Sequence, residues 1–218
     1  MAVATQPQSR GYRIFHGAMV LVVVAVAGII AAAAGMGINA RIHPEQVGSS
    51  VRRVSDGSKV GGASSTLTRN DDGFDFTFDS SQLPAGHIVT LRAEIFNQPE
   101  HCTHGAKRGT CGADDLTEAS VEGSVVFLRA AWLRGASEVH FEGTLSSGDQ
   151  DHAVTGGGLA NPGAAYVRFV LMDHGAPVAG EFAPMLNTLG AGCANPPFGS
   201  GTPGSIDCAD IQESTHEP

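Results

Sequence analysis

Alternating apolar and polar residues predict that most of this chain is built from β-strands. Phe74, Phe76 and Phe78 alternate with polar residues, which places the three rings on one face of an extended segment. The same period of two recurs in residues 89–95, 139–145 and 165–171. Residues 124–132 are more continuously apolar, as in a central strand, and one more strand is expected within residues 177–189.

Turn-forming residues separate these five or six segments, and no segment shows the pattern of an amphipathic helix. The chain holds 29 Gly and 11 Pro, and only 16% of its residues are charged. Short strands at hairpin-like spacing with Gly/Pro turns are typical of all-β domains. The predicted fold class is therefore all-β, an antiparallel β-sandwich or barrel.

An apolar segment near the N-terminus predicts export across a membrane. Gly17 to Ala40 contains no charged residue, and Arg10 and Arg13 precede it. As a helix this N-terminal hydrophobic segment would be about 36 Å long, against roughly 30 Å for a hydrocarbon core. Residues 1–40 are thus either a signal peptide, cleaved in the small-residue stretch 31–35 or after Ala40, or an uncleaved membrane anchor. Either reading places the rest of the chain outside the cytoplasm, secreted or anchored.

Between this segment and the first clear strand, the composition predicts a flexible linker. Residues 41–69 are rich in Ser and Gly, with scattered charges. The extracytoplasmic β domain is therefore expected to cover residues 70–218.

Four cysteines, all in the exported part, predict disulfide bonds. They are Cys102, Cys111, Cys193 and Cys208, an even number as in many exported proteins. Three connectivities are open, and we favour local pairing, because each local pair flanks a Gly/Pro-rich loop that has little other means of ordering itself. Closing loops of this size contributes up to about 3 kcal/mol in the chain-entropy model.

The leading functional hypothesis is a non-catalytic binding or interaction module that needs no cofactor and recognises an unidentified ligand or protein. Its candidate binding loop contains Asn97, Glu100, Asp114 and Asp115, because binding residues concentrate on loops held by a rigid scaffold. Beyond residue 40 the chain carries 11 basic and 22 acidic residues, a net charge of −11. Such a surface repels phosphate backbones, so nucleic acid is excluded as the expected partner.

Histidines near the cysteines raise a second hypothesis, a metal-binding protein or metalloenzyme. His101 and His104 flank Cys102, and His174 ends a predicted strand. Imidazole is a common ligand of copper and zinc, so these three histidines, with His140 as a further candidate, form the alternative site. The CxxC pairs of many structural zinc sites are absent.

An enzyme with an unrecognised active site is the third hypothesis. The sequence has no GxSxG, HExxH or P-loop motif. Asp173 and His174 offer an acid–base pair if the fold brings them together with a carboxylate such as Glu100. No nucleophile follows from the sequence.

Two short motifs in combination carry a resemblance to a known family. Residues 96–102 read FNQPEHC, residues 111–116 read CGADDL, and a Gly-Cys pair lies at residues 192–193. Over roughly residues 74–212 the chain resembles an uncharacterised family of exported bacterial proteins with an FNxPxxC…CGxxDL segment and a C-terminal cysteine pair. The resemblance implies export and a bacterial source, and it implies no particular activity.

Overall fold

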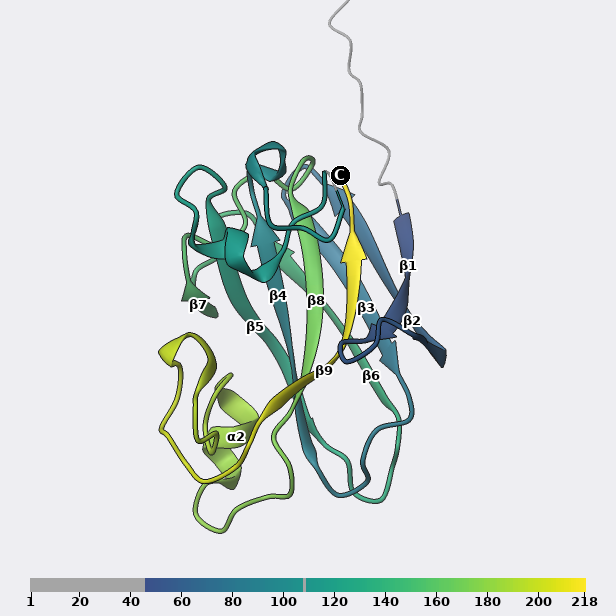
Figure 1. The fold of residues 1–218 in the computed structure, drawn as a ribbon, viewed down its shortest axis with the longest axis vertical. Coiled ribbons are helices and arrows are strands. Elements are labelled where there is room, and N and C mark those ends of the chain that lie inside the picture. The colour runs from purple at the N-terminus through teal and green to yellow at the C-terminus, as the bar shows by residue number, and fades with distance from the viewer. Residues whose placement is uncertain (1–45, 108) are drawn as a thin grey trace, which may run out of the picture. The chain divides into compact units, whose positions relative to one another are not determined.

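Nine antiparallel strands form one continuous sheet in the computed structural model, which describes residues 46–107 and 109–218 (Figure 1). The strands are β1 (Gln46–Arg53), β2 (Lys59–Asn70), β3 (Gly73–Ser80), β4 (Ile88–Phe96), β5 (Gly123–Trp132), β6 (Val139–Ser146), β7 (Ala153–Thr155), β8 (Tyr166–Asp173) and β9 (Ala209–His216). Their order across the sheet is β6-β3-β2-β1-β9-β8-β4-β5-β7. The prediction of an all-β antiparallel domain is confirmed.

The sheet curls into a half-barrel, as the core contacts show. Three strands separate β3 from β8 in the sheet, yet the ring of Phe169 on β8 packs against Phe74, Phe76 and Phe78 on β3, with ring centroids 5.4 to 6.4 Å apart. Strands β6 and β7 remain at the two edges of the sheet. The architecture is therefore one curled sheet, where the sequence predicted two packed sheets or a closed barrel.

Two strands occupy most of the segment that the sequence predicted as a linker. β1 pairs with β2 and β9, and β2 pairs with β3 over the register from Ser64–Asp79 to Asn70–Gly73. Only Val51, Val60 and Leu67 of this segment are apolar and buried. The amino-acid composition of this segment is that of a flexible linker. Backbone hydrogen bonds to β3 and β9 nevertheless hold the segment in the folded domain. This corrects the predicted boundary at residue 70.

Residues 177–189 contain a short helix, α2 (Phe182–Asn187), where a sixth strand was expected. Phe182, Met185 and Leu186 lie three and four positions apart, and they pack with Ile88 on the outer face of β4. The apolar spacing fits a helix, so the strand prediction is wrong here. Two short 3-10 helices, η1 (Pro99–His101) and η2 (Ala113–Thr117), lie in the β4–β5 loop, and a third, η3 (Pro197–Gly199), precedes β9.

Strand β4 is buried at all nine positions, because both faces of the sheet are covered there. Val89, Leu91, Ala93 and Ile95 face the main core. The outer face carries other clusters, which involve the β4–β5 loop (residues 97–122) and the β8–β9 segment (residues 174–208). These two segments therefore form the outer surface of the domain over β4.

The predicted signal peptide or anchor, residues 1–40, lies outside the described residues. Within residues 46–107 and 109–218, no helix has the length and apolar character needed to cross a membrane.

Candidate functional site

Two local disulfides close the segments that cover the outer face of the sheet. Cys102 is bonded to Cys111, and Cys193 is bonded to Cys208. The first packs with Phe96 of β4, and the second packs with Met172 of β8. This is the pairing that the sequence favoured, and it is consistent with a protein of an oxidising, extracytoplasmic compartment.

Asp115 organises the interior of the β4–β5 loop. Its carboxylate is fully buried and accepts hydrogen bonds from the backbone N–H groups of Thr103, His104 and Gly112 at 2.8 to 3.2 Å. Nδ1 of His104 lies 3.0 Å from the same carboxylate. Burial by itself raises the pKa of Asp115, but these hydrogen bonds outweigh it and lower the pKa to about 2. Asp115 therefore shapes the loop and is not free to contact a ligand.

Asn97 joins the β4–β5 loop to the loop that precedes β8. Its amide nitrogen donates to the carbonyl oxygens of Glu122 and Gly158, at 2.9 and 3.0 Å. Its amide oxygen accepts from the N–H groups of Ala160 and Asn161, at 2.9 and 3.4 Å. The side chain is buried, and these four contacts use its hydrogen-bonding capacity. Asn97 is thus a structural bridge between the two loops.

A pocket of about 440 Å³ lies where these two loops meet. It is lined by Pro99, Glu100, Cys102, Gly109, Ala164 and Pro218. Its size falls in the range of small-molecule sites, about 300 to 1,000 Å³. Of the four residues predicted for the binding loop, Glu100 lines the pocket, Asp114 is exposed beyond its lining, and the other two are the buried supports described above.

The structure places the predicted metal-binding histidines at separate positions. Nδ1 of His101 donates to the carbonyl oxygen of Ser120, at 2.6 Å, and His104 pairs with Asp115. His140 lies on β6, where it pairs with Asp79 on β3. His174 is fully buried at the end of β8. These four histidines do not converge on one point.

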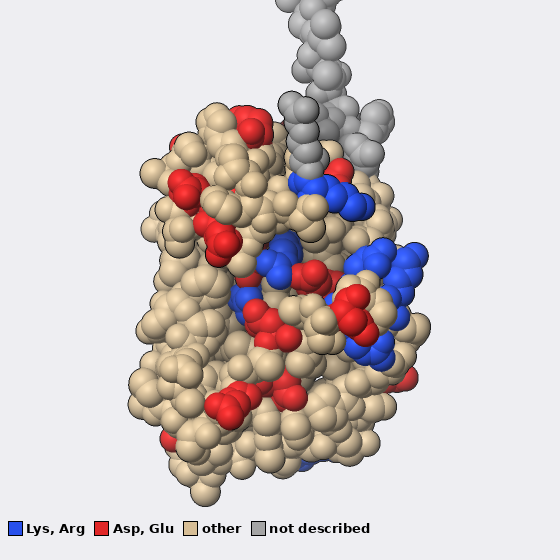
Figure 2. Space-filling view, viewed as in Figure 1, with Lys and Arg blue, Asp and Glu red and all other residues tan. Residues whose placement is uncertain are grey.

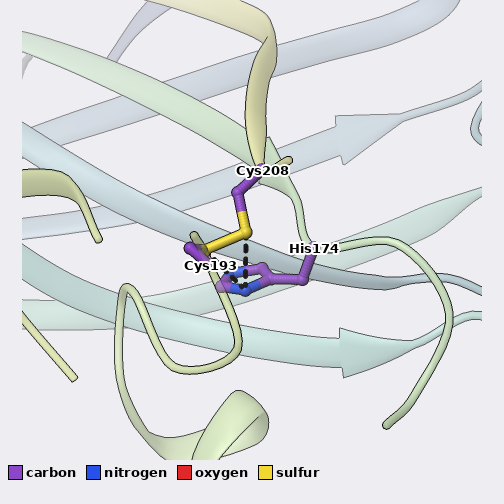
Figure 3. Close-up of side chains that lie close together, drawn as sticks. All are labelled: His174, Cys193 and Cys208. Carbon is purple, nitrogen blue, oxygen red and sulfur yellow. Dashed lines mark hydrogen bonds between the residues drawn. A yellow bond between two sulfur atoms is a disulfide. The ribbon is translucent and has the colours of Figure 1, made fainter. Parts of the chain in front are cut away.

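His174 instead lies against the second disulfide (Figure 3). Its Nδ1 atom is 3.6 Å from Sγ of Cys193 and 3.8 Å from Sγ of Cys208. Among the described residues this is the group of His, Cys, Asp and Glu side chains whose geometry suits a metal ion. The sequence predicted the Cys193–Cys208 pair and singled out His174 separately, but it offered no signal that the fold brings His174 to this disulfide.

A network of paired charges, buried at Arg92 and Glu94 and partly exposed at its other members, lies on the outer face of β4, β8 and β9. The carboxylate of Glu94 accepts hydrogen bonds from the guanidinium groups of Arg92 and Arg168 at 2.7 to 3.0 Å. Arg92 also donates two bonds to Asp210, and Arg168 donates to Glu213. Figure 2 shows acidic and basic side chains gathered at the middle of this face. Sequence alternation assigned Arg92 and Glu94 to the polar face of a half-buried strand, but it gave no sign that loops cover that face.

The residues proposed for acid–base chemistry do not assemble as the enzyme hypothesis requires. Asp173 pairs with Nδ1 of His87 at 2.9 Å and accepts from the backbone N–H of Gly175. Glu100 lines the pocket beside the first disulfide instead. Nε2 of His216 lies 2.9 Å from Oγ of Ser65, but both side chains are buried in the core and out of reach of a substrate.

Comparison with known proteins adds no relative: no family model matches the chain, and searches among curated proteins and among solved structures find no similar protein. The family resemblance of the FNQPEHC and CGADDL motifs stays a prediction.

Proposed function

We propose that this chain is a non-catalytic binding module that acts outside the cytoplasm, and that its ligand enters the pocket beside the Cys102–Cys111 disulfide. The observation that carries the proposal is the pocket itself, a 440 Å³ hollow on the loop that the sequence singled out. The two disulfides and the apolar segment 17–40 support an extracytoplasmic location. That segment either is removed or holds the domain at a membrane.

The wall of the pocket is held rigidly from three directions. The disulfide links Cys102 to Cys111, Asp115 collects the backbone N–H groups of the loop, and Asn97 fixes the neighbouring loop that carries Ala164. A loop ordered before binding loses less conformational entropy when the ligand arrives. The supporting contacts therefore favour affinity even though they never touch the ligand.

The lining of the pocket indicates the ligand's chemistry. Pro99, Ala164 and the half-cystine Cys102 offer apolar surface, and Glu100 offers a carboxylate side chain at the rim. The acidic excess of the whole domain attracts cations over a longer range. We therefore propose a ligand with a small apolar body and a positively charged group, such as an amine or a basic peptide side chain.

A fragment titration tests this proposal. We would record amide spectra of the oxidised, ¹⁵N-labelled protein with a set of small organic cations and a matched set of organic anions. The proposal expects saturable shifts from cations that centre on residues 97–116. Shifts from neither set at the pocket, or equal shifts from both sets, would contradict it.

Two variants that each remove one negative charge distinguish binding in the pocket from attraction by the domain's overall negative charge. Glu100→Gln removes the carboxylate that lines the pocket, whereas Asp114→Asn removes an exposed carboxylate on the same loop that does not line it. For a cation that binds, Glu100→Gln should weaken the affinity about fivefold, or about 1 kcal/mol. Asp114→Asn should leave the affinity within about twofold. An equal effect of both variants would assign binding to the overall charge.

A further inference from the structure

The second disulfide and His174 form a compact group of three potential metal ligands. His174 directly follows β8, Cys193 lies in the β8–β9 segment, and Cys208 directly precedes β9. The ligand atoms of the three side chains all lie within 4.8 Å of one another. Figure 3 shows the imidazole ring directed at the two sulfur atoms.

The imidazole is oriented by a second hydrogen bond on its far side. Nε2 lies 2.9 Å from Oγ1 of Thr90, a buried residue of β4. When Nε2–H donates to this hydroxyl, Nδ1 carries the lone pair that points at the sulfurs. Such a partner on the distal nitrogen is the usual support of a metal-binding histidine. Nδ1 also lies 3.3 Å from the carbonyl oxygen of Ala191. As a hydrogen bond this contact needs a proton on Nδ1, so metal binding requires the other tautomer of His174 and replaces the contact.

The backbone holds the cysteine segments together without help from the S–S bond. Cys193 forms a β-bridge with Ile206. Around it, the N–H of Ala194 donates to Ile206, that of Gly204 donates to Cys193, and that of Ile206 donates to Gly192, at 2.7 to 3.0 Å. These backbone contacts do not involve the S–S bond, so we expect them to keep the two cysteine segments close together when the disulfide is opened.

We propose that reduction of the Cys193–Cys208 disulfide creates a three-ligand site for Cu(I), formed by two thiolates and Nδ1 of His174. Thiolate sulfur selects soft ions such as Cu(I), and imidazole also suits copper. Structural zinc sites take four protein ligands, whereas the described residues bring three together here. The oxidised protein has no thiolate to offer, so the disulfide acts as a redox gate on metal binding.

The gate needs a dithiol reductant, such as an exported dithiol protein. One thiolate of the dithiol attacks Sγ of Cys208, which is partly exposed, and the sulfur of the buried Cys193 leaves. The second thiol of the dithiol then resolves the mixed disulfide. Two electrons pass from the dithiol, which becomes a disulfide, to the two cysteines. Binding of Cu(I) then displaces the two thiol protons to solvent, and the copper keeps its oxidation state.

The binding experiment uses the Cys102→Ser/Cys111→Ser protein, so that the other cysteine pair does not contribute sulfur. We would reduce it anaerobically and titrate Cu(I) against a chromophoric Cu(I) chelator, with the oxidised protein in parallel. The proposal expects one Cu(I) per chain in the reduced protein and none in the oxidised protein. X-ray absorption should show two sulfur scatterers and one nitrogen. Absence of Cu(I) binding, or a site with two sulfurs alone, would overturn it.

Histidine variants test the nitrogen ligand. His174→Gln should weaken Cu(I) binding at least tenfold and remove the nitrogen scatterer. His87→Gln, which alters the neighbouring histidine that pairs with Asp173, should change neither measurement. Equal binding by both variants would overturn the role of His174. If His174→Gln does not fold, the absorption spectrum of the parent protein decides the question. Because this site is not the pocket at Cys102, its failure would leave the proposed function standing.

Discussion

Acidification should destabilise this domain through the buried histidine His216. His216 on β9 is fully buried, its Nε2 lies 2.9 Å from Oγ of Ser65, and its ring packs edge-on against Phe169 at 5.3 Å. Burial, together with the nearby positive charge of Arg69, lowers the pKa of His216 to about 4, from 6.5 for an ordinary histidine. The folded protein therefore holds this ring in its neutral form near pH 7.

The sign and size of the effect follow from proton linkage. Below pH 6.5 the unfolded chain takes up a proton at His216, whereas the folded protein takes it up only near pH 4. Because the unfolded state binds more protons in this window, stability falls as the pH falls from 6.5 to 4. The difference of ~2.5 pKa units, at 1.36 kcal/mol per unit, corresponds to about 3 kcal/mol.

Denaturation of matched variants measures this contribution. We would determine the free energy of unfolding in guanidinium chloride between pH 7 and pH 4 for the parent protein and for His216→Gln. The glutamine lacks the titrating group, so the stability advantage of the parent protein should shrink by about 3 kcal/mol across this range. Parallel profiles for the parent protein and His216→Gln would refute the reasoning.

Three further substitutions test the packing and the buried polar groups. Glu94→Gln removes the buried charge that the guanidinium groups of Arg92 and Arg168 share, so it should cost about 3 kcal/mol in urea unfolding at pH 7, and a loss below about 1 kcal/mol would contradict the network. Phe169→Ala removes the ring at the centre of the core and should cost about 3 to 5 kcal/mol in the same assay. Asn97→Ala leaves four backbone groups without their partner and should cost about 2 to 3 kcal/mol; amide spectra should also show a rearranged pocket, and unchanged spectra would contradict the bridging role.

The sequence predicted the strands that carry their own apolar pattern. Residues 74–78 alternate because one face of β3 meets the core and the other does not, and the same is true of β6. β9 was missed because its core-facing residues are Gln212, Ser214 and His216, which are buried through hydrogen bonds. β1 and β2 were missed for a related reason, since pairing with neighbours holds them and few large apolar side chains contribute. Local periodicity cannot report an interaction that depends on a distant strand.

The functional surface was predictable in part. Cysteine spacing indicated both local disulfides and directed attention to the β4–β5 loop, where the pocket lies. The roles within that loop were not predictable, because Asp115 and Asp114 are adjacent acids and only the fold decides that the first is buried. The group of His174 with the second disulfide likewise depends on how β8 and β9 bring separate segments together.

Intact mass after thiol alkylation tests the central claim most directly, namely a disulfide-held β domain outside the cytoplasm. The protein would be recovered from the membrane and extracellular fractions of its native cells and alkylated with and without prior reduction. The account predicts no added label before reduction and four labels after it, on Cys102, Cys111, Cys193 and Cys208. Protein from either fraction that takes up four labels without reduction would contradict the account.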